Sequence, residues 1–468
     1  MLKLKDTSLD WALTHIEKFG DTNIFPIPFE FEAIRFAWDS DIKPYLLSQD
    51  ILSWTVRPYR RCLTPKHKFG FRISTQLDPL DSIVFTALVG EIGDDIEKSR
   101  IGVDENICFS SRFKLNKDGR MYDKDINFQS FQNYSEKLVS TKKYKYVVVA
   151  DIADFFPRIY SHPLENAIQD CTKKANHAIA IKNMLKGWNY TVSIGIPVGI
   201  SATMLLSELV LDDVDRGLRD ESSIHCRYVD DFRIFCESEK EAYEKLTLLA
   251  NLLYENHALT LQQNKTKIVP KDLFKKIYLQ SESKLELNSL SDKLRQILED
   301  MGIEDPYEEI EYDLLADEYK QEIDSLNLIE ILKEQIENNE LDMPIIKFVL
   351  RRLSQFDNLK ALDVVLKNID KLYPVFTDVI RYVQGLRSLN EEAKHKIGQR
   401  LLTLLEASVV GHLEFHRLWI FNTFSKSTEW DNESEFIKLF KKYPDPYSRR
   451  ELILALGSIV DPNFRTIV

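Results

Sequence analysis

The sequence predicts an α+β domain over about the first 280 residues, followed by an all-α domain. Three observations support this fold class. The β-branched apolar run YKYVVVADIADFF (144–156) is typical of a buried strand. The stretch CRYVDDFRIF (226–235) is typical of two short strands joined by a tight hairpin. From about residue 285, strand signals fade and apolar residues recur at helical spacing to near the C-terminus.

The α+β part alternates strand-like and helix-like segments. After the strand at 144–156, the sequence predicts a helical stretch at 161–188, then a Gly/Pro loop that opens a long amphipathic helix at 193–218. The hairpin follows, and after it a helix at 238–257 and a short strand within 259–269. This order favours an antiparallel sheet over the parallel sheet of a βαβ protein.

The helical half contains four similar segments, each centred on an arginine. These arginines are 30, 36 and 33 residues apart: Arg351, Arg381, Arg417 and Arg450. The spacing suits a solenoid of stacked helix pairs, a HEAT-like helical repeat, although an irregular helical bundle fits nearly as well. We therefore predict three regions: an N-terminal helical extension (1–55), the α+β part (56–280) and the helical-repeat domain (281–468), with acidic residues 300–325 as a connector or an exposed first helix.

Composition excludes several classes of protein. A hydrophobic content of 44% and a charged content of 29% are ordinary for a globular protein. No run approaches the roughly 20 apolar residues that cross a bilayer, and the N-terminus does not resemble a signal peptide. The five cysteines are odd in number and form no CxxC pair. We expect reduced, mostly buried thiols in a cytoplasmic protein without a membrane partner.

The net charge of −12 is unevenly distributed. Residues 281–340 hold 19 acidic and 5 basic residues, a balance of −14, so the remaining chain sums to about +2. The stretch 57–72 has six Lys/Arg, no acidic residue and interleaved aromatics, and 111–124 is a second basic cluster. Phosphate contacts need local positive charge, although a solvated basic face explains these stretches equally well. The candidate contacts to nucleic acid are Arg57, Arg60, Arg61, Lys66 and Arg112.

Two adjacent carboxylates, Asp230 and Asp231, occupy the bend of the predicted hairpin. Aspartate is common in turns, but two charges this close repel each other unless a cation lies between them. Asp151 ends the apolar strand, and it would face Asp230 if strand and hairpin were neighbours in one sheet. Mg²⁺ prefers such oxygen ligands, and two ions about 3.5–4 Å apart promote nucleotidyl transfer. We expect two Mg²⁺, or Mn²⁺ in their place, with Asp230 as direct ligand and Asp231 as the outer one.

The sequence resembles the reverse transcriptases over residues 58–270. Four segments match the palm motifs of that family in order: ADIADFFPRIY (150–160), GIPVGISATMLLSELVLDDVD (195–215), RYVDDFRIF (227–235) and LTLQQNKTKI (259–268). Upstream, KFGFRISTQLDPLDSIVFTAL (68–88) looks like the fingers segment. The resemblance implies a right-hand polymerase with fingers and an antiparallel palm sheet. It also implies that Asp151, Asp230 and Asp231 are catalytic and bind metal, with the Ile152 carbonyl completing a metal shell.

The resemblance also implies a nucleotide pocket. Lys68 and Arg72 match the cations that hold the triphosphate, and Lys66 is an alternative to Lys68. Phe156 matches the bulky residue under the sugar, where a phenyl ring leaves no room for a 2′-hydroxyl and so favours dNTPs. The remaining members are Asp154 through its backbone amide, Phe155 (for which core packing is the preferred reading), Val198, Gly199 and Lys265, for which a surface lysine is an equal alternative.

One position departs from the family. Most reverse transcriptases have Gln where this chain has Val198, and valine donates no hydrogen bond to the incoming nucleotide or the template. This substitution puts faithful copying of a long template in doubt, whereas Gly195, Pro197 and Gly199 preserve the loop.

The helical half separates subgroups of the family. The sequence contains no recognisable ribonuclease H carboxylate set, HNH endonuclease or zinc cluster, so it resembles the bacterial defence-associated, abortive-infection type. That resemblance implies single-stranded DNA synthesis from dNTPs in anti-phage defence, without template, on a bound noncoding RNA, or primed by a protein hydroxyl, in a homo-oligomer assembled through the helical domain. The alternatives are a template-dependent retroelement or housekeeping reverse transcriptase, and a catalytically silent scaffold that binds nucleic acid.

Overall fold

The computed structural model describes residues 1–189, 193–279, 328–338, 341, 343–430 and 433–459. The chain divides into two compact units. The first comprises Met1–Arg61 and Ser74–Glu282, and the second comprises Cys62–Ile73 and Ser283–Val468. The expected boundary at 281 and the acidic segment 300–325 lie outside the described residues.

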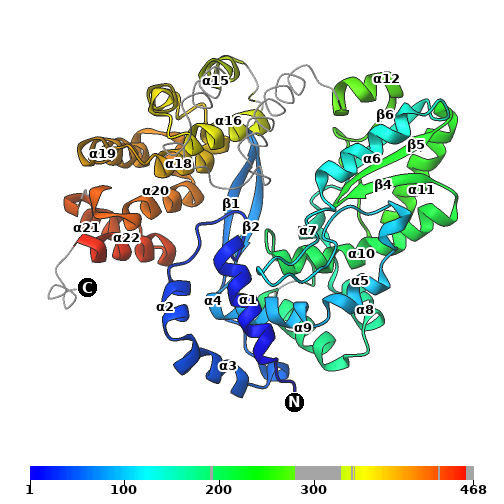
Figure 1. Ribbon diagram of the computed structural model, residues 1–468, viewed down its shortest axis with the longest axis horizontal. Coiled ribbons are helices and arrows are strands. Elements are labelled where there is room, and N and C mark those ends of the chain that lie inside the picture. Colours follow the sequence, from blue (N-terminus) through cyan, green and yellow to red (C-terminus); the bar gives the residue numbers. More distant parts are fainter. Residues whose placement is uncertain (190–192, 280–327, 339–340, 342, 431–432, 460–468) are drawn as a thin grey trace. The chain divides into compact units, whose positions relative to one another are not determined.

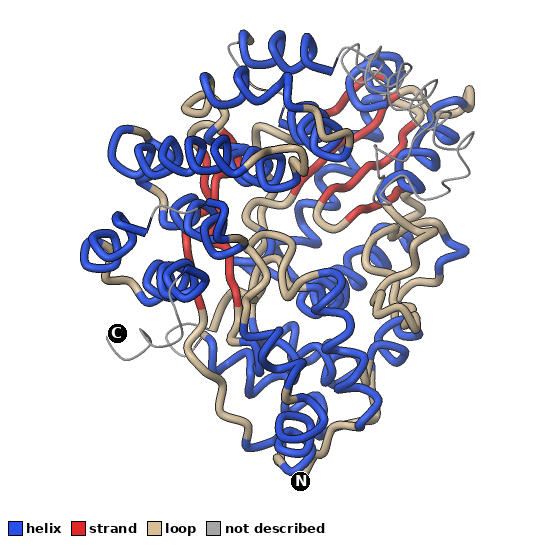
Figure 2. Tube along the Cα trace, turned by 60° about the vertical axis from the view of Figure 1, so that its left-hand side comes forward, coloured by secondary structure: helices blue, strands red, loops and turns tan. Residues whose placement is uncertain are grey.

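A four-stranded antiparallel sheet organises the first unit, in the order β4-β5-β3-β6 (Figures 1 and 2). Its strands are β3 (Tyr146–Asp151), β4 (Ile224–Tyr228), β5 (Asp231–Cys236) and β6 (Lys267–Pro270). β3 pairs with both β5 and β6, and β4 and β5 form the hairpin. The predicted antiparallel sheet is therefore present. The strand expected over 144–156 ends at Asp151, and the one expected within 259–269 forms only at Lys267–Pro270.

Alternate residues of the central strands face opposite sides of this sheet, as the twofold period of a strand requires. Val148 and Ile234 belong to a core that also contains residues of helices α10 (Ser201–Asp220) and α11 (Glu239–His257). Val147 and Phe235 belong to a second core, on the side of helix α6 (Phe128–Ser140). Since both faces of the central strand β3 are covered, its residues 147–150 are apolar without interruption.

Two helices of the first unit have clear capping residues. The side chain of Ser238 accepts a hydrogen bond from Glu241 N at the start of α11, and Ala258 ends that helix in the left-handed conformation. Asn127 caps α6 by a capping box with Ser130. The remaining helices of the first unit are α1 (Asp6–Phe19), α2 (Glu30–Phe36), α3 (Lys43–Ser48), α4 (Pro79–Gly90), α5 (Gly93–Ser99), α7 (Phe155–Arg158), α8 (Ser161–Cys171), α9 (Ala175–Trp188) and α12 (Lys271–Phe274).

Residues 1–55 do not form a separate extension. Leu9 and Leu13 of α1 and Ile83 of α4 are fully buried in the same core as the palm strands. Burial of such leucines contributes about 1.5–3 kcal/mol each, which ties this segment to the α+β unit. The hairpin of β1 (Arg60–His67) and β2 (Gly70–Gln76) is divided instead, because its tip belongs to the second unit.

The described part of residues 283–468 is helical, as predicted. It contains α15 (Leu328–Glu337), α16 (Met343–Gln355), α17 (Leu362–Lys367), α18 (Phe376–Gly385), α19 (Glu391–Ala407), α20 (Glu414–Lys426), α21 (Glu433–Lys442) and α22 (Pro446–Ile459). Helices α16, α18, α20 and α22 pack in succession, each against the next. No helix among the described residues is long and apolar enough to cross a membrane. Of the five cysteines, four are buried and none is in a disulfide.

Candidate active site

Two strand ends bring the three aspartates together. Asp151 is the last residue of β3 and Asp231 the first residue of β5, and the two lie directly opposite each other in the antiparallel register. Asp230 lies in the turn before β5, where its backbone oxygen accepts a hydrogen bond from Ile152 N at 3.3 Å. The expectation that Asp151 faces Asp230 is therefore corrected, because the register gives that position to Asp231.

The charges at this strand end repel one another. Loss of solvation, then repulsion by Asp230 and then by Asp151, raises the pKa of Asp231 to about 7. The Lys265 ammonium supplies positive charge by donating to Asp151 Oδ1 at 2.8 Å. Burial opposes this ion pair, but the hydrogen bond to Asp151 raises the pKa of Lys265 on balance.

The donor chemistry of the three aspartates suits a hard divalent cation, because all are carboxylates on one strand end and Asp231 experiences excess negative charge. Their arrangement is less complete. Among the described residues, no group of three or more His, Cys, Asp or Glu side chains is arranged to hold a metal ion. Instead, the Lys265 ammonium donates a hydrogen bond to the Asp151 carboxylate. Binding of Mg²⁺ here would require Lys265 to release Asp151 or the carboxylates to rotate.

A glycine-rich loop, residues 195–199, lies beside the end of β3. Gly195 N donates to Ile159 O at 2.8 Å, and Ile196 N donates to Phe156 O at 3.0 Å. On its other side, Asn23 N donates to Gly199 O and Thr75 N donates to Val198 O. These hydrogen bonds fix the backbone of residues 195–199 to the segment that follows β3.

Gly199 is required by this geometry. Its φ is +94°, and a Cβ there would lie 2.7 Å from Ile24 Cδ1 and 3.2 Å from Asn23 Oδ1. Gly195 also has a positive φ, of +90°. Substitution at either position would strain the backbone. Between them, the apolar side chain of Val198 is half-buried.

The two phenylalanines have different environments. Phe155 is 3% exposed and belongs to the core, in agreement with the packing role expected for it. Phe156 is half-buried at the edge of that core, and the two ring centroids lie 5.3 Å apart. Asp154 is exposed and adopts the left-handed conformation at φ 50° in the turn after β3. These placements leave Phe156 and Asp154 beside the strand end that carries Asp151.

Two of the predicted nucleic-acid contacts are wrong. Arg60 and Arg112 are each 2% exposed. Arg60 Nη1 donates to Gln76 Oε1, and Arg112 Nη1 forms an ion pair with Glu97 at 3.0 Å. These guanidinium groups are buried by protein partners, so they do not offer the surface charge that a phosphate contact needs.

The other basic candidates lie nearer the surface. Arg57 Nη1 forms an ion pair with the buried Asp81 at 3.1 Å, which assigns it at least a structural role. Arg61 is exposed and donates to Asn189. Lys66, Lys68 and Arg72 are exposed on the tip of the β1–β2 hairpin, within the second unit.

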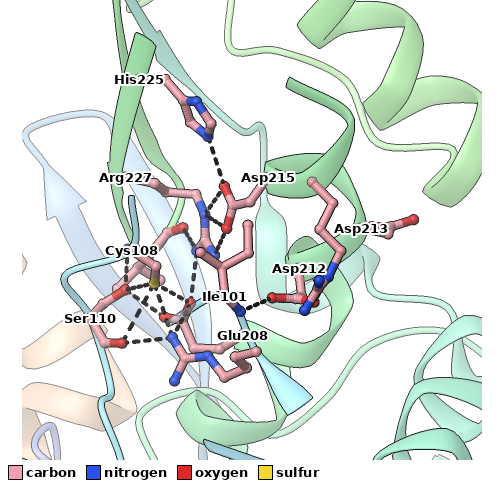
Figure 3. A network of polar contacts seen from close by, with 12 residues as sticks. Ile101, Cys108, Ser110, Glu208, Asp212, Asp213, Asp215, His225 and Arg227 are labelled. Atoms are coloured by element: carbon pink, nitrogen blue, oxygen red, sulfur yellow. Dashed lines mark hydrogen bonds and ion pairs between the residues drawn. The ribbon is translucent and has the colours of Figure 1, made fainter. Parts of the chain in front are cut away.

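Sequence reasoning missed a buried ionic network behind the hairpin (Figure 3). Its central side chains are Arg227 on β4, Glu208 and Asp215 on α10, and Arg100, all of them at most 5% exposed. One signal was present in the sequence. Glu208 interrupts the apolar stretch MLLSELVL, and a charge at such a position must be paired when the helix is buried.

A separate cavity of about 370 Å³ lies between α8, α10 and α11. Neither the three aspartates nor the glycine-rich loop contributes to its lining. It therefore belongs to a different part of the first unit from the carboxylate site.

Comparison with known proteins supports the fold implied by this site. Residues 109–300 match the family model described as reverse transcriptase (RNA-dependent DNA polymerase). The matched residues include the β3 strand, the hairpin and all three aspartates. Over these residues, which are less than half of the chain, the sequence is similar to the reverse transcriptase family. No curated protein matches the chain.

Among solved structures, the chain is similar to telomerases from two yeasts. Apo telomerase from Candida tropicalis is 11% identical at a TM-score of 0.35, over 84% of this chain and 74% of that one. Telomerase from Candida albicans, in complex with a fragment of telomeric RNA, is 11% identical at a TM-score of 0.35, over 82% of this chain and 69% of that one. A C-terminally truncated apo form from C. tropicalis is 13% identical at a TM-score of 0.33, and the match covers 45% of this chain and 50% of that one. At these scores the likeness carries no weight for the function of the chain.

Proposed function

We propose that the protein is a reverse-transcriptase-type DNA polymerase that adds dNTPs to a growing DNA strand by metal-dependent nucleotidyl transfer. One observation carries the proposal: the antiparallel register puts Asp151 opposite Asp231, with Asp230 in the adjoining turn. Carboxylates gathered at one strand end are costly to maintain unless a cation neutralises them, and the raised pKa of Asp231 reflects that cost.

In this proposal, Asp151, Asp230 and Asp231 hold two Mg²⁺, for which Mn²⁺ can substitute, and the Ile152 carbonyl adds a ligand. The bound metal would lower the pKa of an attacking 3′-hydroxyl and stabilise the pyrophosphate leaving group. Lys265, which donates to Asp151 Oδ1, would supply positive charge near the substrate phosphates.

The proposed nucleotide pocket is formed around the glycine-rich loop. Phe156 lies beside the strand end and would exclude a 2′-hydroxyl, which favours dNTPs. Val198 and Gly199 would form the loop wall, and the Asp154 amide would contact phosphate. Lys68 and Arg72 are exposed on the hairpin of the second unit, and we propose them separately as cations for a triphosphate.

We further propose that the polymerase acts in bacterial anti-phage defence of the abortive-infection type. The basis is the combination of a palm with an all-helical second unit, whose helices α16, α18, α20 and α22 pack in succession as a helical repeat would. Its product would be single-stranded DNA, made without template, on a noncoding RNA or from a protein primer. The helical unit would serve as the contact surface of a homo-oligomer.

Two other candidates each have a specific observation in their favour. The family model that matches residues 109–300 describes RNA-dependent polymerases, which favours template-dependent synthesis by a retroelement-type or housekeeping enzyme. The ion pair of Lys265 with Asp151 favours a silent palm that serves only as a nucleic-acid-binding scaffold. That ion pair is also compatible with a site that awaits its substrate, so we rank both below the polymerase.

Incorporation of labelled dNTPs by the purified full chain tests the proposal. The reaction contains Mg²⁺, and parallel samples contain no nucleic acid, a primed RNA template or a primed DNA template. Incorporation in the sample without nucleic acid supports the defence-type polymerase, and digestion of the product with ribonuclease, proteinase or nuclease identifies its primer. Incorporation only on RNA supports the template-dependent enzyme. Silence of all samples, with either Mg²⁺ or Mn²⁺, would contradict the polymerase.

A further inference from the structure

Val229, immediately before the two hairpin aspartates, has an unfavourable backbone conformation. Its φ is +55°, in the left-handed region that β-branched residues avoid because Cβ meets the neighbouring carbonyl. Such conformations persist only where surrounding contacts determine them, and they concentrate at functional sites. Its side chain also packs against the main core of the first unit, so glycine would not replace it without loss.

Two hydrogen bonds hold both polar groups of the Val229 backbone. Val229 N donates to Ser110 Oγ at 2.8 Å, and Arg227 Nη1 donates to Val229 O at 2.7 Å. Together with the core contact of the side chain, these bonds restrain the residue from three sides. Rotation of Val229 to an ordinary conformation would break both bonds.

The partners of Val229 are themselves fixed by the buried network (Figure 3). Ser110 Oγ donates to Glu208 Oε1 at 2.6 Å, and Arg227 Nη1 forms an ion pair with Glu208 Oε2 at 2.8 Å. One carboxylate on α10 therefore orients both groups that hold the turn. Arg227 Nε also donates to Asp215 at 3.0 Å. Burial opposes ionisation of Asp215, but the charge of Arg227 lowers its pKa, so this ion pair stays charged.

The buried network also contacts the hairpin turn. Glu208 and Asp215 on α10 accept hydrogen bonds from three of the five N–H groups of Arg227, and Nη1 also donates to Val229 O. The next two residues along the chain are Asp230 and Asp231. A change of φ at Val229 would turn Asp230 and alter the approach of Asp231 to Asp151.

We propose that Ser110 and Arg227, oriented by Glu208, are positioning residues that hold Val229 in the left-handed conformation and thereby fix the Asp230 and Asp231 carboxylates for a divalent cation. This inference rests on the proposed function of the three aspartates. Ser110 and Arg227 act through Val229 and touch neither the metal nor the substrate.

The variant Ser110→Ala tests the proposal with the smallest disturbance, because it removes one hydroxyl and no charge. Its matched control is Ser135→Ala. Like Ser110, Ser135 is buried and forms a hydrogen bond with an arginine network, since its hydroxyl accepts from Arg233. It lies on α6 and does not contact Val229. The probe is Mn²⁺, whose binding to the full chain is followed by electron paramagnetic resonance. The steady-state kcat and KM for dNTP incorporation are measured in parallel.

We expect Ser110→Ala to weaken Mn²⁺ binding about fivefold and to lower kcat by a similar factor with KM for dNTP little changed, because the hydrogen bond that holds Val229 N is lost. Ser135→Ala should bind Mn²⁺ as the wild type does, at a comparable loss of thermal stability. Ser110→Thr retains the hydroxyl and should preserve binding. Should Ser110→Ala fail to fold, the Mn²⁺ affinity of Val229→Asn in the wild-type background tests the same turn.

The double variant Ser110→Ala, Val229→Asn provides the decisive comparison. Asn tolerates a positive φ far better than Val, so the turn of Val229→Asn should depend less on the Ser110 hydroxyl. Adding Ser110→Ala to Val229→Asn should therefore lower the Mn²⁺ affinity less than adding it to the wild type. No rescue, or equal losses in Ser110→Ala and Ser135→Ala, would overturn the positioning role. A wild type that binds no Mn²⁺ and incorporates no dNTP would instead overturn the proposed function, and this inference with it.

Discussion

Asp151 and Asp231 lie directly opposite each other on antiparallel strands β3 and β5, at the end of the sheet. Opposed residues of an antiparallel pair project from the same face, so their carboxylates share one surface. Like charges in this relation destabilise a sheet, and loss of solvation with repulsion raises the pKa of Asp231 to about 7. A fold that maintains this pair gains stability when a cation binds between the two carboxylates.

Replacing Lys265 should separate its two proposed roles. Its ammonium is 2.8 Å from Asp151 Oδ1 and competes there with a metal ion. We expect Lys265→Met to tighten Mg²⁺ binding a few-fold in the absence of nucleotide, and to raise KM for dNTP because a cation near the phosphates is lost. Isothermal calorimetry and steady-state kinetics measure the two effects. Lys267→Met, at an exposed position of β6, is the control, and equal behaviour of both variants would refute the competition.

Removing the Phe156 ring should admit ribonucleotides. The half-buried ring lies beside the strand end, and overlap with a 2′-hydroxyl would cost about 1–3 kcal/mol. We expect Phe156→Ala to lower the preference for dCTP over CTP, measured as the ratio of kcat/KM values, by about 10- to 100-fold. Tyr243→Ala, an exposed position on α11, should leave the ratio unchanged. An unchanged ratio in Phe156→Ala would remove Phe156 from the pocket.

Val198 offers a gain-of-function test. Its side chain forms no hydrogen bond, while its backbone oxygen accepts from Thr75 N. In Val198→Gln the new amide would add one hydrogen bond to nucleotide or template, worth about 1 kcal/mol. We expect incorporation on a primed template to rise about fivefold relative to incorporation without template. If that proportion stays at the wild-type value, Val198 does not determine template use.

The helical unit should lose stability in acid through His416. This residue of α20 is 1% exposed, and burial lowers its pKa to about 4 despite a hydrogen bond with Val410 O. His416 therefore binds a proton near pH 6.5 in the unfolded chain but only near pH 4 in the folded chain. Stability should fall by about 1.4 kcal/mol for each pH unit through this window as pH decreases. Urea unfolding at several pH values measures the slope.

Substitution of His416 should remove that slope. His416→Phe cannot titrate, so its free energy of unfolding should depend less on pH between 6.5 and 4 than that of the wild type. His395→Gln, at an exposed histidine of α19, provides the control and should keep the wild-type slope. Identical slopes in His416→Phe and the wild type would show that other groups govern the acid response.

Much of the fold was predictable because its signals are local. The apolar run at 146–151 and the hairpin on either side of Val229 follow directly from strand periodicity, and the start of α11 follows from Ser238. The integration of residues 1–55 into the first unit was not predictable, because it depends on contacts such as that of α1 with α4. Periodicity identifies an apolar face but does not name the face against which it packs.

The candidate site was predicted more completely in composition than in arrangement. The aspartates were identified, but the register that pairs Asp151 with Asp231 depends on where β3 meets β5, which no short motif contains. Charge alone misled the reading of Arg60 and Arg112, because their partners Gln76 and Glu97 lie 16 and 15 residues away. A basic residue in a basic stretch is not necessarily exposed.

Whether this strand end is a catalytic centre is tested most directly by comparing Asp230→Asn with Asp272→Asn in Mg²⁺-dependent incorporation of labelled dNTPs by the full chain. Asp272 is an exposed aspartate on α12 and controls for the loss of one charge. We expect Asp272→Asn to retain the wild-type rate and Asp230→Asn to lower it by about three orders of magnitude, since several kcal/mol of transition-state stabilisation would be lost. Equal rates in Asp230→Asn and the wild type would contradict the assignment of this strand end as a catalytic centre.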